Sequence, residues 1–232
     1  MAKKNQFDVK SYVEAVEAEL SRHANKARAA ASKAYVRDLF DYYGLTTPQR
    51  RDVQMKFHND IDLPPFELIP EIVKALWNKK ERECQYFAMD LYEKYRKQFT
   101  KKDVPVFEYM IRNKSWWETV DFIAPKLIAA LHLKHPELQE ENCRRWMKSN
   151  HLWLMRAAII HQNLYKKKTN EVLLFKLISQ CMDHEDFFIR KAIGWSLRQY
   201  ARTNPSAVKK FVKANEQSLS ELSKKEALKH VG

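Results

Sequence analysis

Apolar residues recur along most of the chain at the three- and four-residue spacing that places them on one face of an α-helix. Tyr12, Val13, Val16 and Leu20 form the first such stripe. The chain contains only three glycines, which leaves little material for hairpin turns, so the pattern predicts an all-α protein. Helices are expected near residues 8–23, 27–43, 66–77, 80–99, 104–112, 116–134, 136–149, 152–167, 171–182, 186–201, 205–213 and 219–231, with one more that opens at Thr47.

Three residues mark the boundary between the second and third predicted helices. Gly44 suits the position just after a helix end, where the chain often takes a left-handed conformation. Thr47 is expected to cap the next helix, with Pro48 at its first position. The helix at 27–43 is therefore predicted to end directly before Gly44.

The second half of the chain contains an internal repeat, because residues 151–160 resemble residues 185–194. Arg156 and Arg190 are 34 residues apart, and Asn170 and Asn204 share that offset. An aromatic-x-x-Arg helix that recurs at this period, followed by a shorter helix, is typical of stacked helical pairs. Such pairs form a curved solenoid with a concave face. The segment 115–136 looks like an earlier, more degenerate copy.

In such a solenoid, Arg156 and Arg190 are expected to lie one repeat apart along the concave face. Two interpretations of this pair are open. A ladder of guanidinium groups suits regularly spaced phosphates, whereas each Arg equally suits an ion pair with an acid of the next repeat. The spacing alone favours neither interpretation.

Charge is distributed unevenly along the 232 residues. The formal net charge is +13, and from Asn142 to the end there are 18 Lys and Arg against 7 Asp and Glu. This asymmetry indicates a polyanionic partner for the C-terminal part, most often nucleic acid. The 45% apolar content is sufficient for a core without covalent staples.

Cysteine and histidine usage argues against a disulfide framework or a metal site. Cys84, Cys143 and Cys181 are far apart and odd in number, as is typical of reduced intracellular thiols. His132 and His135 share a predicted helix but no third ligand accompanies them, so they are interpreted as solvated surface residues. No apolar run reaches the ~20 residues that cross a bilayer, and the N-terminus lacks the apolar core of a secretory signal. We therefore expect a cytoplasmic protein with no membrane partner and no metal.

The stretch from Asn113 to Asp121, Asn-Lys-Ser-Trp-Trp-Glu-Thr-Val-Asp, carries the candidate chemistry. Ser115 and Glu118 have the spacing of a capping box, which predicts a helix start at Ser115. Trp117 and Asp121 then lie one turn apart on one face. An aromatic face beside a carboxylate near a helix N-terminus suits a bound cation. Taken alone, however, the motif favours tryptophans packed in a core beside a solvated or paired Asp121.

The remaining aromatic and basic candidates have plainer interpretations. Trp77, Trp146 and Trp153 are predicted to be core residues, because repeat interfaces bury large aromatic side chains. The lysine run at 166–168 falls at a predicted helix end. It is either a solvated end, where cations suit the helix dipole, or a contact to phosphate, and both interpretations stay open.

Several ordered stretches together resemble one known family. They are Gly44-Leu-Thr-Thr-Pro-Gln-Arg-Arg51, Lys114-Ser-Trp-Trp-Glu-Thr-Val-Asp121, Trp153-Leu-Met-Arg-Ala-Ala-Ile159 and Phe188-Ile-Arg-Lys-Ala-Ile-Gly-Trp-Ser-Leu-Arg198, with Thr203-Asn-Pro205 close behind. Their order and spacing, over nearly the whole chain, are similar to those of the AlkD-like DNA alkylation repair glycosylases, which are built of HEAT-like repeats. The resemblance implies one all-α domain over residues 1–232, a right-handed α-α superhelix (solenoid) with degenerate repeats over about 1–112 and clearer repeats over about 113–232.

The resemblance also implies an activity. The chain would be an enzyme that hydrolyses the N-glycosidic bond of cationic N3- or N7-alkylated purines, such as 3-methyladenine and 7-methylguanine, in duplex DNA. The modified base is expected to remain stacked in the duplex, so a base-flipping pocket is not needed. The protein is expected to act in base excision repair as a monomer, without a cofactor or an obligate protein partner.

Site residues follow from the same resemblance. Trp116 is expected to pack inward, and Glu118 stands where the family often has Asp, a change that a capping box tolerates. The implied roles are catalytic for Asp121, Trp117 and Trp195, a supporting cation on the DNA-facing surface for Arg156, an aromatic near the lesion for Tyr35, and further DNA contacts for Arg190 and Lys191.

These residue types suit the implied chemistry. A cationic purine is already a good leaving group, so one carboxylate suffices to stabilise the oxocarbenium-like sugar, and indole faces add cation–π attraction. The alternative is a HEAT-like scaffold that binds nucleic acid or protein through a basic concave face without catalysis. Such a scaffold has no need for Trp117, Asp121, Arg156 and Trp195 together.

Overall fold

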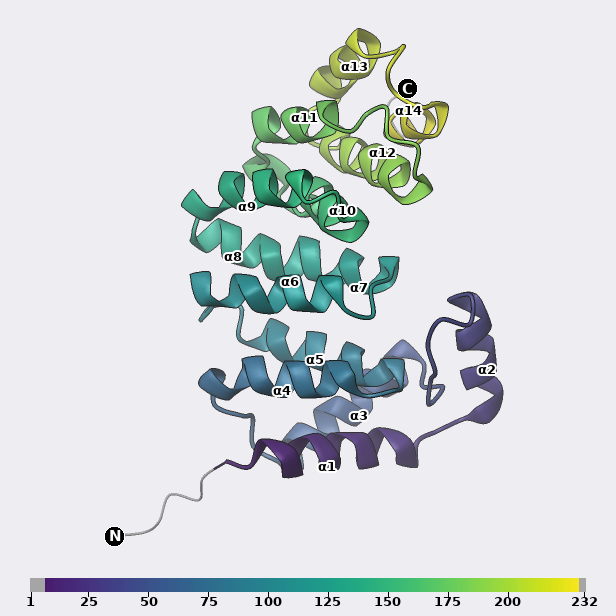
Figure 1. The fold of residues 1–232 in the computed structure, drawn as a ribbon, viewed down its shortest axis with the longest axis vertical. Coiled ribbons are helices and arrows are strands. Elements are labelled where there is room, and N and C mark those ends of the chain that lie inside the picture. Colours follow the sequence, from purple (N-terminus) through teal and green to yellow (C-terminus); the bar gives the residue numbers. More distant parts are fainter. Residues whose placement is uncertain (1–6, 230–232) are drawn as a thin grey trace. The chain divides into compact units, whose positions relative to one another are not determined.

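The computed structural model describes residues 7–229, which form an all-α protein (Figure 1). Apart from an isolated bridge between Asp41 and Glu81, the described residues contain no β-structure, so the all-α prediction is confirmed. The chain divides into two compact units, residues 1–98 and 99–232, and each is described by itself. Its organisation as a single domain stays a prediction.

The first unit packs its helices around an apolar core. It contains α1 (Val9–Arg22), α2 (Lys26–Tyr35), α3 (Thr47–Asp60), the 3-10 turn η1 (Phe66–Leu68), α4 (Ile69–Asn78) and α5 (Arg82–Lys94). Helix α1 packs against α3, α4 and α5. The apolar stripe predicted on α1 provides this contact, since Tyr12, Val13, Val16 and Leu20 are all at most 4% exposed.

The segment between α2 and α3 differs from the prediction, because α2 ends at Tyr35 and not at Tyr43. A buried carboxylate on α5 holds this segment. Glu83 accepts hydrogen bonds from the backbone N–H groups of Tyr43, Gly44 and Leu45 at 3.0, 2.8 and 3.1 Å. Gly44 has a φ of 92°, and a Cβ there would lie 2.3 Å from the carbonyl oxygen at the N-cap of α2. The glycine therefore permits a close approach of two backbone segments and does not end a helix.

The second unit consists of helical pairs stacked in sequence order (Figure 1). It contains the 3-10 turn η2 (Lys101–Asp103), α6 (Val104–Arg112), α7 (Trp117–Phe122), the π-helix η3 (Ile123–Ile128), α8 (Ala129–Lys134), α9 (Glu137–Lys148), α10 (Leu152–Ile160), the 3-10 turn η4 (Lys166–Lys168), α11 (Glu171–Ser179), α12 (Phe187–Ala201), α13 (Pro205–Ala214) and α14 (Glu221–Ala227). Helix α10 packs on α9 and on α12, and α11 packs on α9 and α10. This stacking is that of an all-α helical-repeat solenoid, which confirms the predicted fold class.

Helix caps account for the repeat offset found in the sequence. Asn170 begins α11 and Asn204 begins α13, and each side chain accepts a hydrogen bond from the backbone N–H three residues further on. Asn is a strong N-cap residue because it satisfies a donor that the first helical turn leaves free. Thr46 caps α3 in the same way, one residue earlier than the predicted Thr47. The offset shared by the two asparagines thus marks equivalent helix starts.

Residues 117–134 form one continuous helical stretch, close to the prediction, but its middle part is a π-helix. Pro125 lies inside this part. In an α-helix, the N–H of residue 125 would donate to the Asp121 carbonyl oxygen, and a proline both lacks that N–H and clashes with that carbonyl. The wider π turn accommodates the ring without ending the helix.

Large aromatic side chains occupy the cores of both units. Trp77, Trp146 and Trp153 are 0%, 1% and 8% exposed, which confirms that they are core residues. The three cysteines are free and buried. Within the part of the chain that the structure describes, no helix has the length and apolar character needed to span a membrane.

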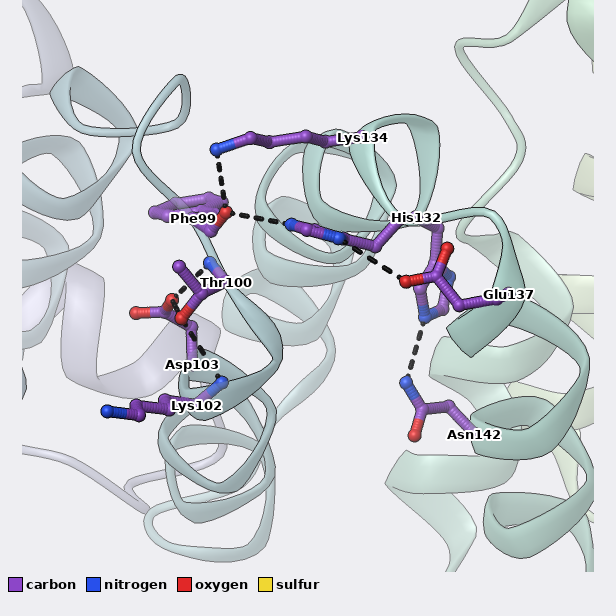
Figure 2. Close-up of polar contacts among 9 residues, drawn as sticks. Phe99, Thr100, Lys102, Asp103, His132, Lys134, Glu137 and Asn142 are labelled. Atoms are coloured by element: carbon purple, nitrogen blue, oxygen red, sulfur yellow. Dashed lines mark hydrogen bonds and ion pairs between the residues drawn. The ribbon is translucent and has the colours of Figure 1, made fainter.

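His132 is a core residue, so its interpretation as a solvated surface residue is wrong. Its side chain is 2% exposed, and its Nε2 lies 3.1 Å from Asn142 Nδ2 (Figure 2). The ring also stacks on Trp146, with centroids 5.9 Å apart. His135 lies at the end of the same helix and is half-buried, with its Nε2 3.2 Å from the Phe99 carbonyl oxygen. The His132 ring therefore helps to join α8 to α9.

Candidate active site

Asp121 and Arg156 form the centre of the candidate site, where α7 meets α10. Arg156 donates from Nε to Asp121 Oδ1 and from Nη2 to Asp121 Oδ2, both at 2.8 Å. Its Nη1 donates to the Phe188 carbonyl oxygen at 2.6 Å. A bidentate pair of this kind fixes both partners, because two parallel hydrogen bonds set the orientation of each plane. The carboxylate is thus held in one orientation.

The helix that carries Asp121 begins at Trp117 and not at Ser115, and the predicted capping box is absent. The Ser115 hydroxyl instead donates to the Ile111 carbonyl oxygen at 2.5 Å. Lys114, directly before it, takes a positive φ of 48°. Ser115 therefore satisfies a carbonyl that the end of α6 leaves without a helical donor, and it does not open the next helix.

A cluster of aromatic rings lies beside this helix start. Trp116 packs edge-on against Trp153 and Phe188, with centroids 5.7 and 5.4 Å apart. The Trp153 and Phe188 rings are 5.0 Å from one another. Tilted and edge-on contacts are favoured because the positive ring edge meets the negative ring face. Trp116 thus packs inward, as predicted, and joins the start of α7 to α10 and α12.

A pocket of about 310 Å³ opens beside the ion pair. Its lining contains five residues that the sequence singled out: Trp117, Asp121, Arg156, Lys191 and Trp195. Phe187, Phe188, Arg198 and Glu226 complete the lining. The Asp121 side chain is 19% exposed and the Arg156 side chain 6%, so the carboxylate is the more accessible partner of the pair.

Glu226 on α14 is a pocket residue that sequence reasoning missed. Its carboxylate accepts a hydrogen bond from Lys191 Nζ at 2.8 Å and also pairs with Arg198. Helix α14 reaches α12 at Gly194, where a Cβ would lie 2.6 Å from Glu226 Cβ. A glycine inside a predicted helix is a signal of close approach, so Gly194 offered a clue to this contact. Lys191, predicted as a DNA contact, is held by a carboxylate in this structure.

The other predicted DNA contacts are placed differently. Arg190 is outside the pocket lining, and its Nε donates to the His184 carbonyl oxygen at 2.9 Å. Arg156 is 5% exposed and pairs with an acid of the preceding helical pair, not of the next one. Tyr35 is the last residue of α2 in the first unit and is 71% exposed. The DNA-binding roles of these residues stay predictions.

Burial raises the pKa of the Asp121 carboxyl above its ordinary value of 3.8, and Arg156 opposes this shift while Glu118 adds to it. A carboxylate with little surrounding water interacts more strongly with a nearby positive charge, because the local dielectric constant is lower. The pocket therefore contains an oriented, partly desolvated carboxylate, and the indole side chains of Trp117 and Trp195 belong to the same lining. Among residues 7–229, no group of three or more His, Cys, Asp or Glu side chains is arranged to hold a metal ion.

Comparison with known proteins identifies the family. A family model described as DNA alkylation repair enzyme matches residues 16–231. The chain belongs to the DNA alkylation repair enzyme family. Comparison with curated proteins gives no match. The family resemblance noted in the sequence is thereby confirmed.

Solved structures are similar to this DNA alkylation repair enzyme over almost its full length. One, described as a predicted DNA alkylation repair enzyme from Enterococcus faecalis, is 32% identical, with a TM-score of 0.83 over 90% of this chain and 97% of that chain. AlkD2 from Streptococcus mutans is 16% identical, with a TM-score of 0.66 over 97% and 99% of the two chains. The smu.31 protein of Streptococcus mutans UA159 is also 16% identical, with a TM-score of 0.64 over 97% and 100%. The last two share the fold.

Membership in the DNA alkylation repair enzyme family assigns this chain a role in the repair of alkylated DNA, with DNA as its partner. Such a protein must meet a polyanion and a lesion that is often cationic. The basic C-terminal part suits contact with the polyanion, and the pocket contains the Asp121 carboxylate.

Proposed function

We propose that this DNA alkylation repair enzyme is a glycosylase that hydrolyses the N-glycosidic bond of cationic N3- and N7-alkylated purines in duplex DNA. The observation that carries the proposal is the oriented Asp121 carboxylate in a pocket that Trp117 and Trp195 also line. The proposed reaction uses no cofactor, and the modified base stays stacked in the duplex.

Asp121 acts on the sugar and not on the base. An N3- or N7-alkylated purine leaves as a neutral base, so its departure needs no proton from the enzyme. Positive charge instead develops on the deoxyribose, which becomes oxocarbenium-like as the bond breaks. A preorganised carboxylate stabilises this charge more in the transition state than in the ground state, and that difference is what accelerates the reaction.

The ion pair with Arg156 leaves Asp121 able to stabilise the positive charge that develops on the sugar. An ionised carboxylate has about four lone-pair positions, and the bidentate pair with Arg156 occupies two of them. The remaining positions are available to the sugar or to the water that attacks it. Trp117 and Trp195 supply electron-rich faces that attract the same developing charge, although each contributes less than the carboxylate.

Glu226 has a different task from Asp121, although both carboxylates line the pocket. Glu226 pairs with two cations, Lys191 and Arg198, whose combined charge exceeds its own. Asp121 pairs with one cation, Arg156, and its side chain stays 19% exposed in a pocket that Trp117 and Trp195 also line. Glu226 is therefore assigned to hold the two basic side chains in place, and Asp121 is the group that acts on the sugar.

The test is release of 7-methylguanine from methylated duplex DNA under single-turnover conditions, with the spontaneous rate subtracted. Asp121→Asn is expected to lower the release rate by about 100-fold or more, since removal of one preorganised electrostatic group typically costs 10²–10³. Glu140→Gln is the matched control, because Glu140 is a surface carboxylate that pairs with Lys176 on a neighbouring helix. It is expected to keep the wild-type rate.

Folding must be separated from chemistry in this test, because Asp121→Asn leaves the Arg156 charge without its partner. The double variant Asp121→Asn with Arg156→Gln replaces the ion pair by an amide pair, and circular dichroism reports whether each variant is folded. If folded Asp121→Asn releases base as fast as wild type, or if wild type shows only the spontaneous rate, the glycosylase proposal is wrong. The second outcome favours a scaffold that binds DNA without catalysis.

A further inference from the structure

A second pocket, larger than the Asp121 pocket, lies where the loop after α10 meets the C-terminal half of α12. Its volume is about 730 Å³, and residues 162–169 form most of one side. The lysine run at 166–168, for which the sequence left two interpretations open, forms the turn η4 on this side. The proposed glycosylase reaction uses none of these residues.

The lining of this pocket carries positive charge only. Lys166, Lys167, Lys168 and Arg202 all line it and are exposed, and the lining contains no Asp or Glu. Within residues 7–229, none of these four side chains forms an ion pair with a carboxylate at 4.0 Å or less. Elsewhere in the second unit, basic side chains such as Lys176 and Lys191 do pair with acids. The pocket therefore concentrates cations that no acid of the described residues neutralises.

A buried amide, Asn163, also belongs to the lining of this pocket. Asn163 is 8% exposed, and its Oδ1 accepts a hydrogen bond from the Ser196 hydroxyl at 2.7 Å. Its Nδ2 is buried and has no hydrogen-bond partner among the described residues. The nitrogen is shielded from solvent, so a ligand in the pocket reaches it only after the side chain moves.

This pocket is distinct from the Asp121 pocket, although α12 contributes to both. Lys191, Trp195 and Arg198 face the Asp121 pocket, whereas Ser196, Gln199 and Tyr200 face the second one. At about 100° per residue, the centres of these two sets are separated by roughly 120° around the helix axis. One helix thus presents two different faces to two different pockets.

We propose that the second pocket binds a phosphate group. A phosphate matches the lining because it presents only acceptor oxygens at its ionised positions and carries negative charge. The three lysines and Arg202 supply both the opposite charge and the N–H donors at the pocket wall. The group can belong to a nucleic-acid backbone or be free phosphate, and two arms of one experiment separate these sources.

The first arm titrates the full chain with inorganic phosphate at constant ionic strength, with chloride as the reference, and follows the side-chain amide signal of Asn163 by NMR. A saturable shift is expected. The double variant Lys167→Gln with Lys168→Gln is expected to weaken binding by about tenfold or more, since charge-assisted hydrogen bonds are lost. Lys148→Gln with Lys210→Gln is the matched control, because both lysines are exposed and outside this pocket, and it is expected to bind as wild type does.

The second arm measures binding of an undamaged DNA duplex at several salt concentrations. If the phosphate comes from a nucleic-acid backbone, the pocket double variant is expected to reduce the slope of log affinity against log salt by about 2, while the control double variant changes it less. If only inorganic phosphate binds and the slopes agree, the pocket is a site for free phosphate. Both results support the proposal.

Two results would overturn it. One is the absence of a saturable response to inorganic phosphate together with equal salt slopes for all variants. The other is equal weakening by the pocket and control variants, which would show a general charge effect. Asn163→Asp adds a check of the charge, since it keeps the acceptor for Ser196 but places a negative charge in the lining beside the cations, and it should abolish phosphate binding. None of these measurements uses base release, so their outcome is independent of the glycosylase proposal.

Discussion

A guanidinium that binds both oxygens of a carboxylate has two opposed effects on it. Arg156 fixes the orientation of Asp121, which favours a preorganised site. The same cation also lowers the negative potential that Asp121 offers to a developing positive charge. The balance depends on whether Asp121 is ionised at the working pH, and Arg156 favours the ionised form against the effect of burial.

This balance predicts how the pH dependence changes when Arg156 is removed. The active form of Asp121 is ionised, so activity falls as the pH drops through the pKa of its carboxyl, which burial places above 3.8. Without the cation this pKa rises further. Arg156→Gln is therefore expected to move the acid limb of the single-turnover rate to higher pH, by about one unit or more. The measurement is 7-methylguanine release between about pH 4.5 and 8.

A lower rate alone would not support this role for Arg156, because a disordered site would also react slowly. The position of the acid limb is the deciding quantity. Arg144→Gln removes an exposed arginine from α9 and is expected to leave the limb in place. An unchanged limb in Arg156→Gln would mean that Arg156 does not control the ionisation of Asp121.

At the scale of elements, a single glycine, Gly194, determines how closely α14 packs on α12. Gly194 allows α14 to approach α12 so that Glu226 reaches Lys191 and Arg198. Gly194→Ala is expected to destabilise the protein by about 1–3 kcal/mol, because its Cβ would meet Glu226 Cβ and one of the two helices must move. Urea denaturation measures this change.

A second variant separates packing from charge at this contact. Glu226→Gln keeps the shape of the side chain and removes its negative charge, so it is expected to cost less stability than Gly194→Ala. If Gly194→Ala instead stabilises the protein, as expected from helix propensity alone, then the two helices are not in tight contact at this position.

Local sequence signals located most helices well, and tertiary contacts explain the failures. The helix predicted at 104–112 matches α6, and that predicted at 186–201 matches α12 to one residue, because Pro and Asp mark their starts. The end of α2 was missed because Arg37 and Asp38 take the left-handed conformation directly after it, with φ of 58° and 60°. Glu83, on another helix, then holds the backbone of residues 43–45 in a non-helical conformation. The periodicity of residues 36–45 does not show that Glu83, about 40 residues away, will bind this segment.

The candidate site was predictable to the same degree. Local spacing places Trp117 and Asp121 on one face of a helix, and both residues line the pocket. The pairing of Asp121 with Arg156 joins residues 35 apart, and spacing left the role of Arg156 open between phosphate and acid. Glu226 was missed because it lies on the last described helix, 35 residues after Lys191, and local spacing does not show that this helix packs on α12.

At the scale of the whole molecule, buried histidines should make both units sensitive to acid. Burial lowers the pKa of His132 to about 2 and that of His161 to about 4 in the second unit. It lowers the pKa of His58 to about 4 in the first unit. These rings stay neutral in the folded state, whereas they bind protons in the unfolded state below about pH 6.5.

Stability is therefore expected to be greatest above about pH 6.5 and to fall as the pH drops from there towards 4. His132 and His161 each contribute a loss of up to about 1.4 kcal/mol per pH unit in this window. Urea denaturation at pH 7.5 and pH 5 measures the difference. His132→Gln keeps a polar partner for Asn142. It should lower the slope of unfolding free energy against pH by the contribution of one histidine. Equal slopes for wild type and variant would contradict the neutral state of His132.

The proline in the long helix at 117–134 also changes the phase of that helix. A π turn accommodates one more residue than an α turn, and one extra residue rotates everything before it by about 100° relative to everything after it. Trp117 and Asp121 precede Pro125, whereas His132 follows it and packs in the core. The two parts of the helix thus direct equivalent positions to different sides of the helix axis, although no loop separates them. The apolar face that packs His132 in the core therefore does not continue in line through residues 117–121. Asp121 can face a pocket while the later part of the same helix packs in the core.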